Sequence, residues 1–216
     1  MLVACWSVKG GSGATVVAAS LALLVAERAP GGALFADLAG DGPAVLGLPE
    51  PSSPGLAGWL ASGADVPADA LSRIEVRATP RLGLLPRGEG PLDPARAGVL
   101  AALLDAGSRP VVVDAGAEPG QAAQAVIAAA HRSILVIRPC YLALRRALDP
   151  PLSPTEVVLV REPGRSLGRA DVARVVDAPI VAEVELDPAV ARAVDAGLLA
   201  SRLPRSFARR LQRATP

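Results

Sequence analysis

The sequence predicts a doubly wound α/β domain, in which a mostly parallel sheet carries helices on both faces. Two observations lead to this prediction. Apolar segments of strand length alternate along the chain with segments of helical periodicity. The strand-like segments are apolar throughout, as in Pro-Val-Val-Val-Asp-Ala at residues 110–115, and do not alternate with polar residues. Strands buried on both faces have this composition, because helices cover both sides of a parallel sheet.

The expected elements follow one another from the N-terminus. A strand at residues 2–8 leads into a glycine-rich loop and then an apolar helix at residues 15–28. Two later helices, at residues 94–106 and 188–196, follow aspartates placed to cap them. The other expected strands are residues 33–38, 82–86, 110–115, 133–138, 156–160 and 180–184. The other expected helices are residues 56–61, 68–73, 121–131, 142–148 and 170–176.

Composition limits the classes of protein that this chain can be. With 216 residues and 51% hydrophobic content, it can bury one full core, which we assign to residues 1–200, followed by a tail at 201–216. A net charge of +1 argues against a broad electrostatic attraction to DNA. Two cysteines make no disulfide framework, which favours a cytoplasmic location. Glycines interrupt the apolar residues near the N-terminus, so neither a signal peptide nor a membrane span is expected.

Lys9 is the only lysine of the chain, and it begins the glycine-rich loop. A loop of this kind between a strand and a helix offers backbone N–H groups and a helix N-terminus to phosphate oxygens. A compact lysine charge suits such a crowded site better than the wide guanidinium of arginine. The residues expected to bind the phosphates are Lys9, Gly10, Gly11, Ser12, Gly13, Ala14 and Thr15.

Two carboxylates are expected beside this loop. Asp37 closes the strand at residues 33–38, and Asp114 lies near the end of the strand at residues 110–115. Ligands of doubly wound sheets bind at the carboxyl ends of the strands, so both carboxylates and the Thr15 hydroxyl are predicted to hold Mg²⁺. Plainer roles remain open: Asp114 as a helix cap, and Asp37 and Asp41 as turn formers.

The loop departs from the ordinary phosphate-binding pattern G-x-x-x-x-G-K-[ST], because Ala14 stands in the lysine position and the lysine lies upstream. The pattern K-G-G-x-G-x-T resembles the deviant Walker A loop of the MinD/ParA family of ATPases. Its alanine variant is most similar to the CpaE/TadZ branch, which is associated with Tad (Flp) pilus assembly. Further segments that resemble the family are residues 33–38, 82–86, 111–116, 134–147 and 184–193.

The resemblance implies a homodimer in which two subunits enclose two ATP molecules with Mg²⁺. Lys9 matches the lysine that reaches the partner subunit's phosphate, and it is assigned with Asp37 and Asp41 to the catalytic group. Asp37 matches the first carboxylate of the family's D-x-D motif, and Asp114 matches the Walker B aspartate. The second D-x-D position is Ala39, so Asp41 is the candidate substitute.

Other departures affect catalysis and base recognition. Loss of a charge-assisted contact at Ala14 costs roughly 1.5–3 kcal/mol if nothing replaces it. Arg161 follows the strand at residues 156–160, where the family often has a purine-binding asparagine. Phosphoryl transfer depends on positioned charges, so slow or absent hydrolysis is expected.

The C-terminal tail is basic, and Leu199, Leu203, Phe207 and Leu211 recur in it at helical spacing. It resembles in pattern the membrane-binding helix of some MinD-type proteins, although Pro204 interrupts it. Docking onto the body of the protein and weak peripheral contact with the inner face of the plasma membrane both remain open.

Two functional hypotheses follow. The first is a nucleotide-dependent dimer that organises pilus-assembly or division machinery, with a protein partner. The second is a scaffold that has kept the fold and lost useful ATP turnover. A third, a DNA-partition ATPase, conflicts with the low net charge.

Overall fold

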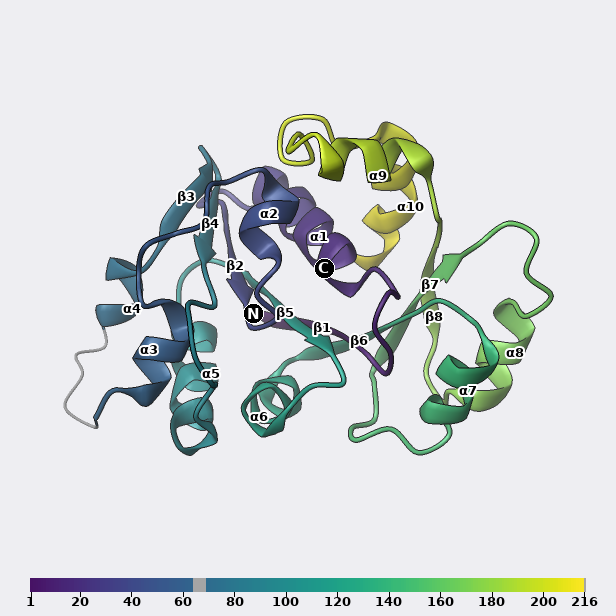
Figure 1. Ribbon diagram of the computed structural model, residues 1–216, viewed down its shortest axis with the longest axis horizontal. Helices are drawn as coiled ribbons and strands as arrows, with labels where there is room; N and C mark the ends of the chain where they lie inside the picture. The colour runs from purple at the N-terminus through teal and green to yellow at the C-terminus, as the bar shows by residue number, and fades with distance from the viewer. Residues whose placement is uncertain (64–68, 216) are drawn as a thin grey trace.

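The computed structural model describes residues 1–63 and 69–215, and it confirms the predicted α/β fold. Within these residues, one sheet has the strand order β3-β4-β2-β5-β1-β6-β7-β8. Every neighbouring pair is parallel except β3 with β4. Figure 1 shows the sheet as a central layer with helices above and below it.

The elements have the following bounds. The strands are β1 Leu2–Ser7, β2 Ala33–Asp37, β3 Val76–Thr79, β4 Leu82–Leu85, β5 Val111–Ala117, β6 Arg132–Ile137, β7 Glu156–Arg161 and β8 Ile180–Glu185. The α-helices are α1 Ala14–Arg28, α2 Gly42–Leu46, α3 Gly55–Ala61, α4 Ala70–Arg73, α5 Ala97–Ala106, α6 Gln121–Ala129, α7 Tyr141–Ala147, α8 Arg169–Val175, α9 Pro188–Asp195 and α10 Arg205–Leu211. Two 3₁₀ segments are η1 Pro94–Arg96 and η2 Gln212–Ala214.

Two hydrophobic cores lie on opposite faces of the sheet. Helices α1, α2, α9 and α10 cover one face, and α3, α5, α6, α7 and α8 cover the other (Figure 1). Successive residues of β1 serve the two cores in turn: Leu2, Ala4 and Trp6 join one, and Val3 and Cys5 join the other. This arrangement explains why the predicted strands are apolar at every position.

The sequence analysis missed two short elements, β3 and α2. β3 is an antiparallel edge strand of four residues, only partly buried, with Arg77 exposed. Too little apolar surface is covered there to mark a strand. α2 is a five-residue helix with Pro43 in its first turn, in a glycine- and proline-rich segment that reads as a turn. The expected helix at 68–73 is observed as α4, and residue 68 lies outside the described residues.

Capping contacts explain where two of the predicted helices begin. Asp93 Oδ1 accepts from the N–H of Ala95, 2.9 Å away, at the start of η1. Asp187 Oδ1 accepts from the N–H of Ala189, 2.8 Å away, at the start of α9. Both aspartates therefore act as the predicted helix caps.

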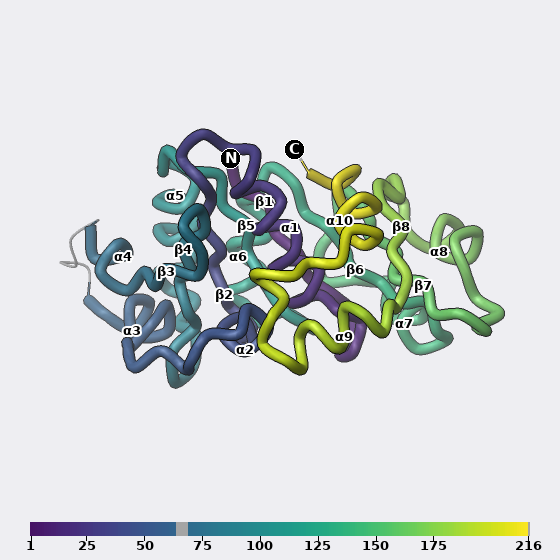
Figure 2. The backbone as a smooth tube through the Cα atoms, turned by 90° about the horizontal axis from the view of Figure 1, so that it is seen from above, coloured from purple at the N-terminus to yellow at the C-terminus, as the bar shows by residue number. Residues whose placement is uncertain are grey.

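The C-terminal tail packs on the body of the protein. α10 lies over α1 and beside β8, as the yellow segment of Figure 2 shows. Phe207, Leu211 and Ala214 are buried in the same core as α1. The apolar face that the sequence analysis considered for membrane contact is therefore occupied within the chain. No helix among residues 1–63 and 69–215 is both long and apolar enough to cross a membrane.

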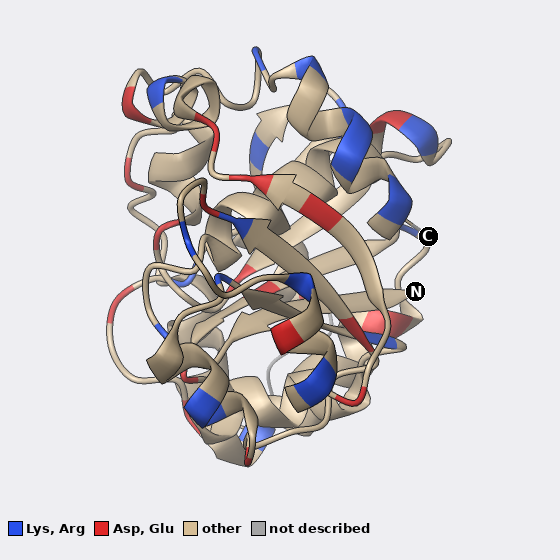
Figure 3. Ribbon diagram, turned by 90° about the vertical axis from the view of Figure 1, so that its right-hand side faces the viewer, with Lys and Arg blue, Asp and Glu red and all other residues tan. Residues whose placement is uncertain are grey.

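Charged residues of both signs mix at the β7–β8 end of the molecule (Figure 3). Arg161 pairs with Glu185 at 2.6 Å and with Glu183 at 3.5 Å, and Arg210 of α10 reaches the same Glu185 at 3.3 Å. These pairs tie α10 to β8 and leave no single-sign field at this end.

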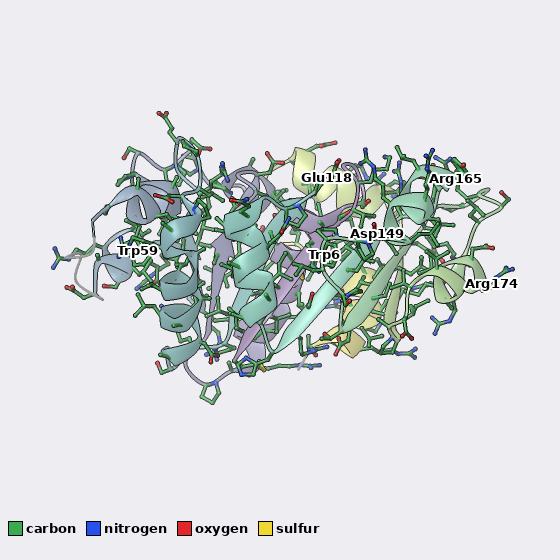
Figure 4. All side chains as sticks on the ribbon, turned by 90° about the horizontal axis from the view of Figure 1, so that it is seen from below. Trp6, Trp59, Glu118, Asp149, Arg165 and Arg174 are labelled. Carbon is green, nitrogen blue, oxygen red and sulfur yellow. The ribbon has the colours of Figure 1, made fainter. Side chains whose placement is uncertain are left out.

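The two tryptophans are packing residues, and Figure 4 places them in different parts of the molecule. Trp59 is 4% exposed, and the Arg96 guanidinium carbon lies 4.1 Å from its ring centroid. Trp6 is fully buried and donates from Nε1 to Ser133 Oγ at 2.9 Å. Trp59 is thus not an exposed anchor for a partner.

Candidate functional site

A cavity of about 790 Å³ opens at the carboxyl ends of the central strands. Loops after β1, β2, β4 and β5 line it, together with the start of α1 and α6. This is the edge where doubly wound sheets bind ligands. The predicted residues that line it are Lys9, Gly10, Gly11, Ser12, Gly13, Ala14, Thr15 and Asp41.

The glycine-rich loop is held by its own short hydrogen bonds. The hydroxyls of Ser7 and Ser12 each donate to the carbonyl oxygen of Lys9 at 2.8 Å. Gly11 and Gly13 have φ values of 73° and 82°, in the left-handed region that favours glycine. Gly13 is the N-cap of α1 and provides no side-chain cap. The first N–H groups of α1 therefore have no side-chain acceptor, which suits an anion.

Lys9 lines the cavity with a partly exposed side chain. Its Nζ donates to the carbonyl oxygen of Gly10, 3.0 Å away, and among the described residues it has no carboxylate partner. The lysine charge is therefore not neutralised within the part of the chain that the structure describes. Ala14, in the usual lysine position, lines the same cavity and brings no charge.

Asp37, the last residue of β2, is paired in register with Asp114, which lies within β5 because that strand continues to Ala117. Both are fully buried behind the cavity lining. Asp37 accepts three backbone N–H groups: those of Ala39 and Gly40 at Oδ1 and that of Gly42 at Oδ2, all within 2.9 Å. Burial raises the pKa of Asp37, and these N–H groups oppose the rise. Asp37 thus holds the loop that follows β2.

Asp114 has a different environment. Its Oδ1 accepts from the N–H of Gly116 at 3.0 Å, while Oδ2 is buried without a hydrogen-bond partner among the described residues. Burial raises the pKa of Asp114 to about 7; the nearby Thr15 hydroxyl and the Gly116 N–H lower it, and the charge of Asp37 raises it further. Because Oδ2 lacks a partner, the hydroxyl acts through proximity and not through a well-formed bond.

Asp41 is exposed and lines the cavity. It precedes α2, yet its side chain makes no capping hydrogen bond. Ala39, in the second D-x-D position, lines the same part of the cavity. Asp41 is therefore the cavity-lining carboxylate of this loop.

The sequence analysis did not single out several polar residues that line the cavity. Glu118 has a left-handed φ of 53° and pairs with Arg146 of α7 at 2.7 Å. Gln121 begins α6. Arg87 follows β4, and its position after a strand end was the only signal available. The missed polar lining residues are Ser7, Arg87, Glu118 and Gln121.

A second, mainly apolar cavity of about 270 Å³ adjoins the loop. Gly13 and Val16 line both cavities. The rest of its wall comes from the ends of β7 and β8 and from α9 and α10, including Val160, Leu186 and Phe207.

Metal ligands are sparse in the described part of the chain. It contains no cluster of three or more His, Cys, Asp or Glu side chains that could hold an ion. A divalent cation at this site would take most of its ligands from water or from a bound phosphate.

Solved structures identify the fold as that of the MinD/ParA family ATPases. A ParA family ATPase from Chlorobium tepidum superposes with a TM-score of 0.79 at 21% identity, over 97% of this chain and 96% of that one. MinD of Pyrococcus horikoshii, complexed with Mg-ADP, gives 0.76 at 21% identity, over 99% and 94%.

An ATP complex of a Cyanothece McdA variant is also similar, with a TM-score of 0.75 at 21% identity, over 99% of this chain and 93% of that one. No protein-family model matches the sequence, and no curated protein matches it. At these identities the similarity establishes the fold, and the function follows from the site.

Proposed function

We propose that this chain binds ATP with Mg²⁺, dimerises around the bound nucleotide, and positions a protein partner in the cell with slow or absent hydrolysis. The observation that carries the proposal is the loop at residues 9–15. It combines two left-handed glycines and an uncapped helix N-terminus at the wall of a cavity of about 790 Å³. These features favour a phosphate chain.

The residues of this loop divide the work of binding. The backbone N–H groups at the start of α1 would hold phosphate oxygens, and Lys9 would contribute a charge without a carboxylate partner. Since Lys9 is partly exposed, a second subunit's phosphate can approach it, as the family resemblance implies. In this proposal Lys9 contacts the nucleotide of the partner subunit and so supports dimerisation, more than it binds the nucleotide of its own subunit.

The described residues fit Mg²⁺ beside the phosphates. Asp114 has a buried oxygen without a partner, and Thr15 has a hydroxyl close to it. Together they can hold an ion and its water shell, and Asp37 is less suited because backbone N–H groups already occupy both of its oxygens. When bound, the ion would neutralise phosphate charge.

The apolar cavity next to Gly13 is a suitable site for the purine base. Its wall is mainly aliphatic and aromatic, with Glu185, Asp187 and Asp195 among the lining residues, and it shares two residues with the phosphate cavity. With Arg161 engaged in ion pairs, base binding would rely on apolar contact and backbone groups. In this proposal the base of the nucleotide lies in the apolar cavity, and its phosphates lie at the glycine-rich loop.

Hydrolysis is expected to be slow, because the groups that orient water and stabilise charge are reduced. Ala14 and Ala39 bring no functional group to the cavity. Asp41 is the carboxylate of the loop after β2 that could orient a water molecule there, while Glu118, the other carboxylate of the lining, pairs with Arg146.

The family similarity supports a role in positioning. One similar structure is a complex of MinD with MinC from Aquifex aeolicus, matched with a TM-score of 0.74. By analogy with the CpaE/TadZ pattern in the loop, we favour a partner in Tad/Flp pilus assembly, with septum or pole positioning as the next candidate. The buried face of α10 makes membrane contact through the tail the weaker interpretation. The net charge of +1 argues against broad binding to DNA.

The test is equilibrium binding of ATP and ADP with Mg²⁺, combined with size-exclusion chromatography. Wild type should bind ATP below millimolar concentration and form a dimer with ATP. Lys9→Ala should bind ATP and remain a monomer, and Lys9→Arg should also dimerise poorly because the loop is crowded. Arg77→Ala, an exposed charge change on β3, is the matched control. Absence of ATP binding at millimolar ligand would refute the proposal.

The second candidate is the scaffold without useful ATP turnover. The three backbone N–H groups that donate to the Asp37 oxygens favour it, because that carboxylate then serves the fold. A constitutive dimer or monomer that recruits its partner equally with and without ATP would support this candidate.

A further inference from the structure

Arg87 stands out among the residues of the phosphate cavity. It follows β4 and lines the cavity from a different loop than Lys9, which follows β1. Lys9 and Arg87 are the two basic side chains that line this cavity within residues 1–63 and 69–215. Their common position raises the question of what Arg87 binds.

The backbone around Arg87 is fixed. Its carbonyl oxygen accepts from the N–H of Ala57 in α3 at 2.8 Å. The same turn packs so closely on Gly55 that a Cβ there would lie 2.6 Å from the Arg87 carbonyl carbon. The side-chain stem lies against Gly40, where a Cβ would come 3.1 Å from Arg87 Cδ, and the two guanidinium hydrogen bonds hold its far end. Arg87 therefore presents its charge from a preorganised position.

The guanidinium is bonded only to neutral oxygens. Nη1 donates to the carbonyl oxygen of Leu38 at 2.6 Å, and Nη2 donates to that of Gly90 at 3.2 Å. A guanidinium has five N–H groups, so about three remain without a partner among the described residues. No carboxylate of the described chain pairs with it, although most arginines with partners here pair with acids. A half-buried arginine with its charge uncompensated favours an anionic ligand.

We infer that Arg87 is a second phosphate-binding cation of this cavity, which supplies from the loop after β4 the charge that is missing at Ala14. The inference rests on the proposed function, because it takes the anion to be the phosphate chain of the nucleotide. It also explains how a loop with Ala14 can retain affinity for a triphosphate. The preorganised fork of arginine suits oxygens of one phosphate group.

The test measures binding of Mg-ATP, Mg-ADP and inorganic triphosphate to wild type, Arg87→Gln and Arg87→Ala. Both variants should bind Mg-ATP about 10- to 150-fold more weakly. Gln keeps a donor for Leu38 and removes the charge, so it reports the charge even if Ala destabilises the turn. Arg77→Ala is the matched control and should bind as wild type. Thermal unfolding of each variant checks the fold.

A rescue sharpens the result. Ala14→Lys should restore Mg-ATP affinity to the Arg87→Gln protein, and should add less in the wild-type background, because the two cations do the same work. Unchanged ATP affinity in Arg87→Gln would overturn the inference while the proposed function stands. If wild type binds no ATP, the proposed function fails. Triphosphate binding that depends on Arg87 would then still support the inference, and no triphosphate binding would overturn it.

Discussion

β2 and β5 carry an aspartate at the same register position, yet they present it differently. Asp37 and Asp114 are neighbours across the two strands, and both are fully buried. Three backbone N–H groups occupy the oxygens of Asp37, whereas one Asp114 oxygen has no hydrogen-bond partner in the described part of the chain. The comparison shows that two aspartates paired across neighbouring strands differ in how far hydrogen bonds occupy their oxygens. We propose that this difference assigns Asp37 to the fold and leaves Asp114 for a ligand.

The loops themselves explain the difference. After β2 the chain turns back over Asp37, and Gly42 comes so close that a Cβ there would lie 2.7 Å from Oδ2. Beyond Asp114, β5 itself continues through Gly116, which packs on Ala39. Only one N–H, that of Gly116, reaches Asp114. The Asp114 carboxylate therefore lies near Thr15, and its Oδ2 accepts no hydrogen bond from the described residues.

Asp37→Ala should have the largest effect on stability. It leaves the N–H groups of Ala39, Gly40 and Gly42 without an acceptor, which should cost about 3–6 kcal/mol of the free energy of unfolding. Urea unfolding measures this loss. Asp37→Asn keeps one acceptor oxygen and should lose less than half as much. A loss below about 1 kcal/mol for Asp37→Ala would show that the three hydrogen bonds to Asp37 do not stabilise the fold.

Asp114 should make stability depend on pH. Its pKa is about 7 in the folded protein and about 3.9 when unfolded, so the folded state holds a proton that the unfolded chain releases. The free energy of unfolding should therefore fall as pH rises from about 4 to 7, by up to about 4 kcal/mol. The pKa of Asp37 is also raised by burial, so Asp37 should add to the fall in the free energy of unfolding as pH rises.

Asp114→Asn removes the titrating group, so it should flatten this pH profile and be more stable than wild type at pH 8 without Mg²⁺. Unfolding curves at several pH values between 4 and 8 measure both effects. Retention of the wild-type slope in Asp114→Asn would assign the pH dependence elsewhere.

The same substitution should weaken the response to Mg²⁺. If Asp114 holds the ion's water shell, Asp114→Asn should bind Mg²⁺ with ATP about 10- to 100-fold more weakly. Titration of Mg²⁺ at constant ATP measures this change, and binding of ATP without Mg²⁺ is the control. Equal Mg²⁺ affinity in the two proteins would leave Asp114 as a purely structural residue.

Asp41→Asn should have the smallest effect on stability, within about 0.5 kcal/mol, because its side chain is exposed and makes no capping bond. Any hydrolysis measured in wild type should fall in this variant if Asp41 orients water. A stability loss as large as that of Asp37→Ala would mean that both aspartates hold the loop.

The alternation of strands and helices was predictable, because each strand reveals its burial through its own composition. Residues 110–115 are an example, and β5 follows them closely. The glycine-rich loop was also predictable, because Gly11 and Gly13 adopt left-handed φ values that glycine favours, and this preference is visible in the residue type itself. β3 was not, because four partly buried residues carry no apolar signal.

The sequence by itself determined the fold class, the glycine-rich loop at residues 9–15 and the helix caps at Asp93 and Asp187, since these depend on composition and on neighbours in the chain. Only the tertiary structure decided that Arg87 joins the cavity and that α10 covers α1. It also decided which of the two paired aspartates, Asp37 or Asp114, has an oxygen without a hydrogen-bond partner among the described residues. The physical reason is that strand order places β4, β2, β5 and β1 side by side, and no local pattern encodes that order.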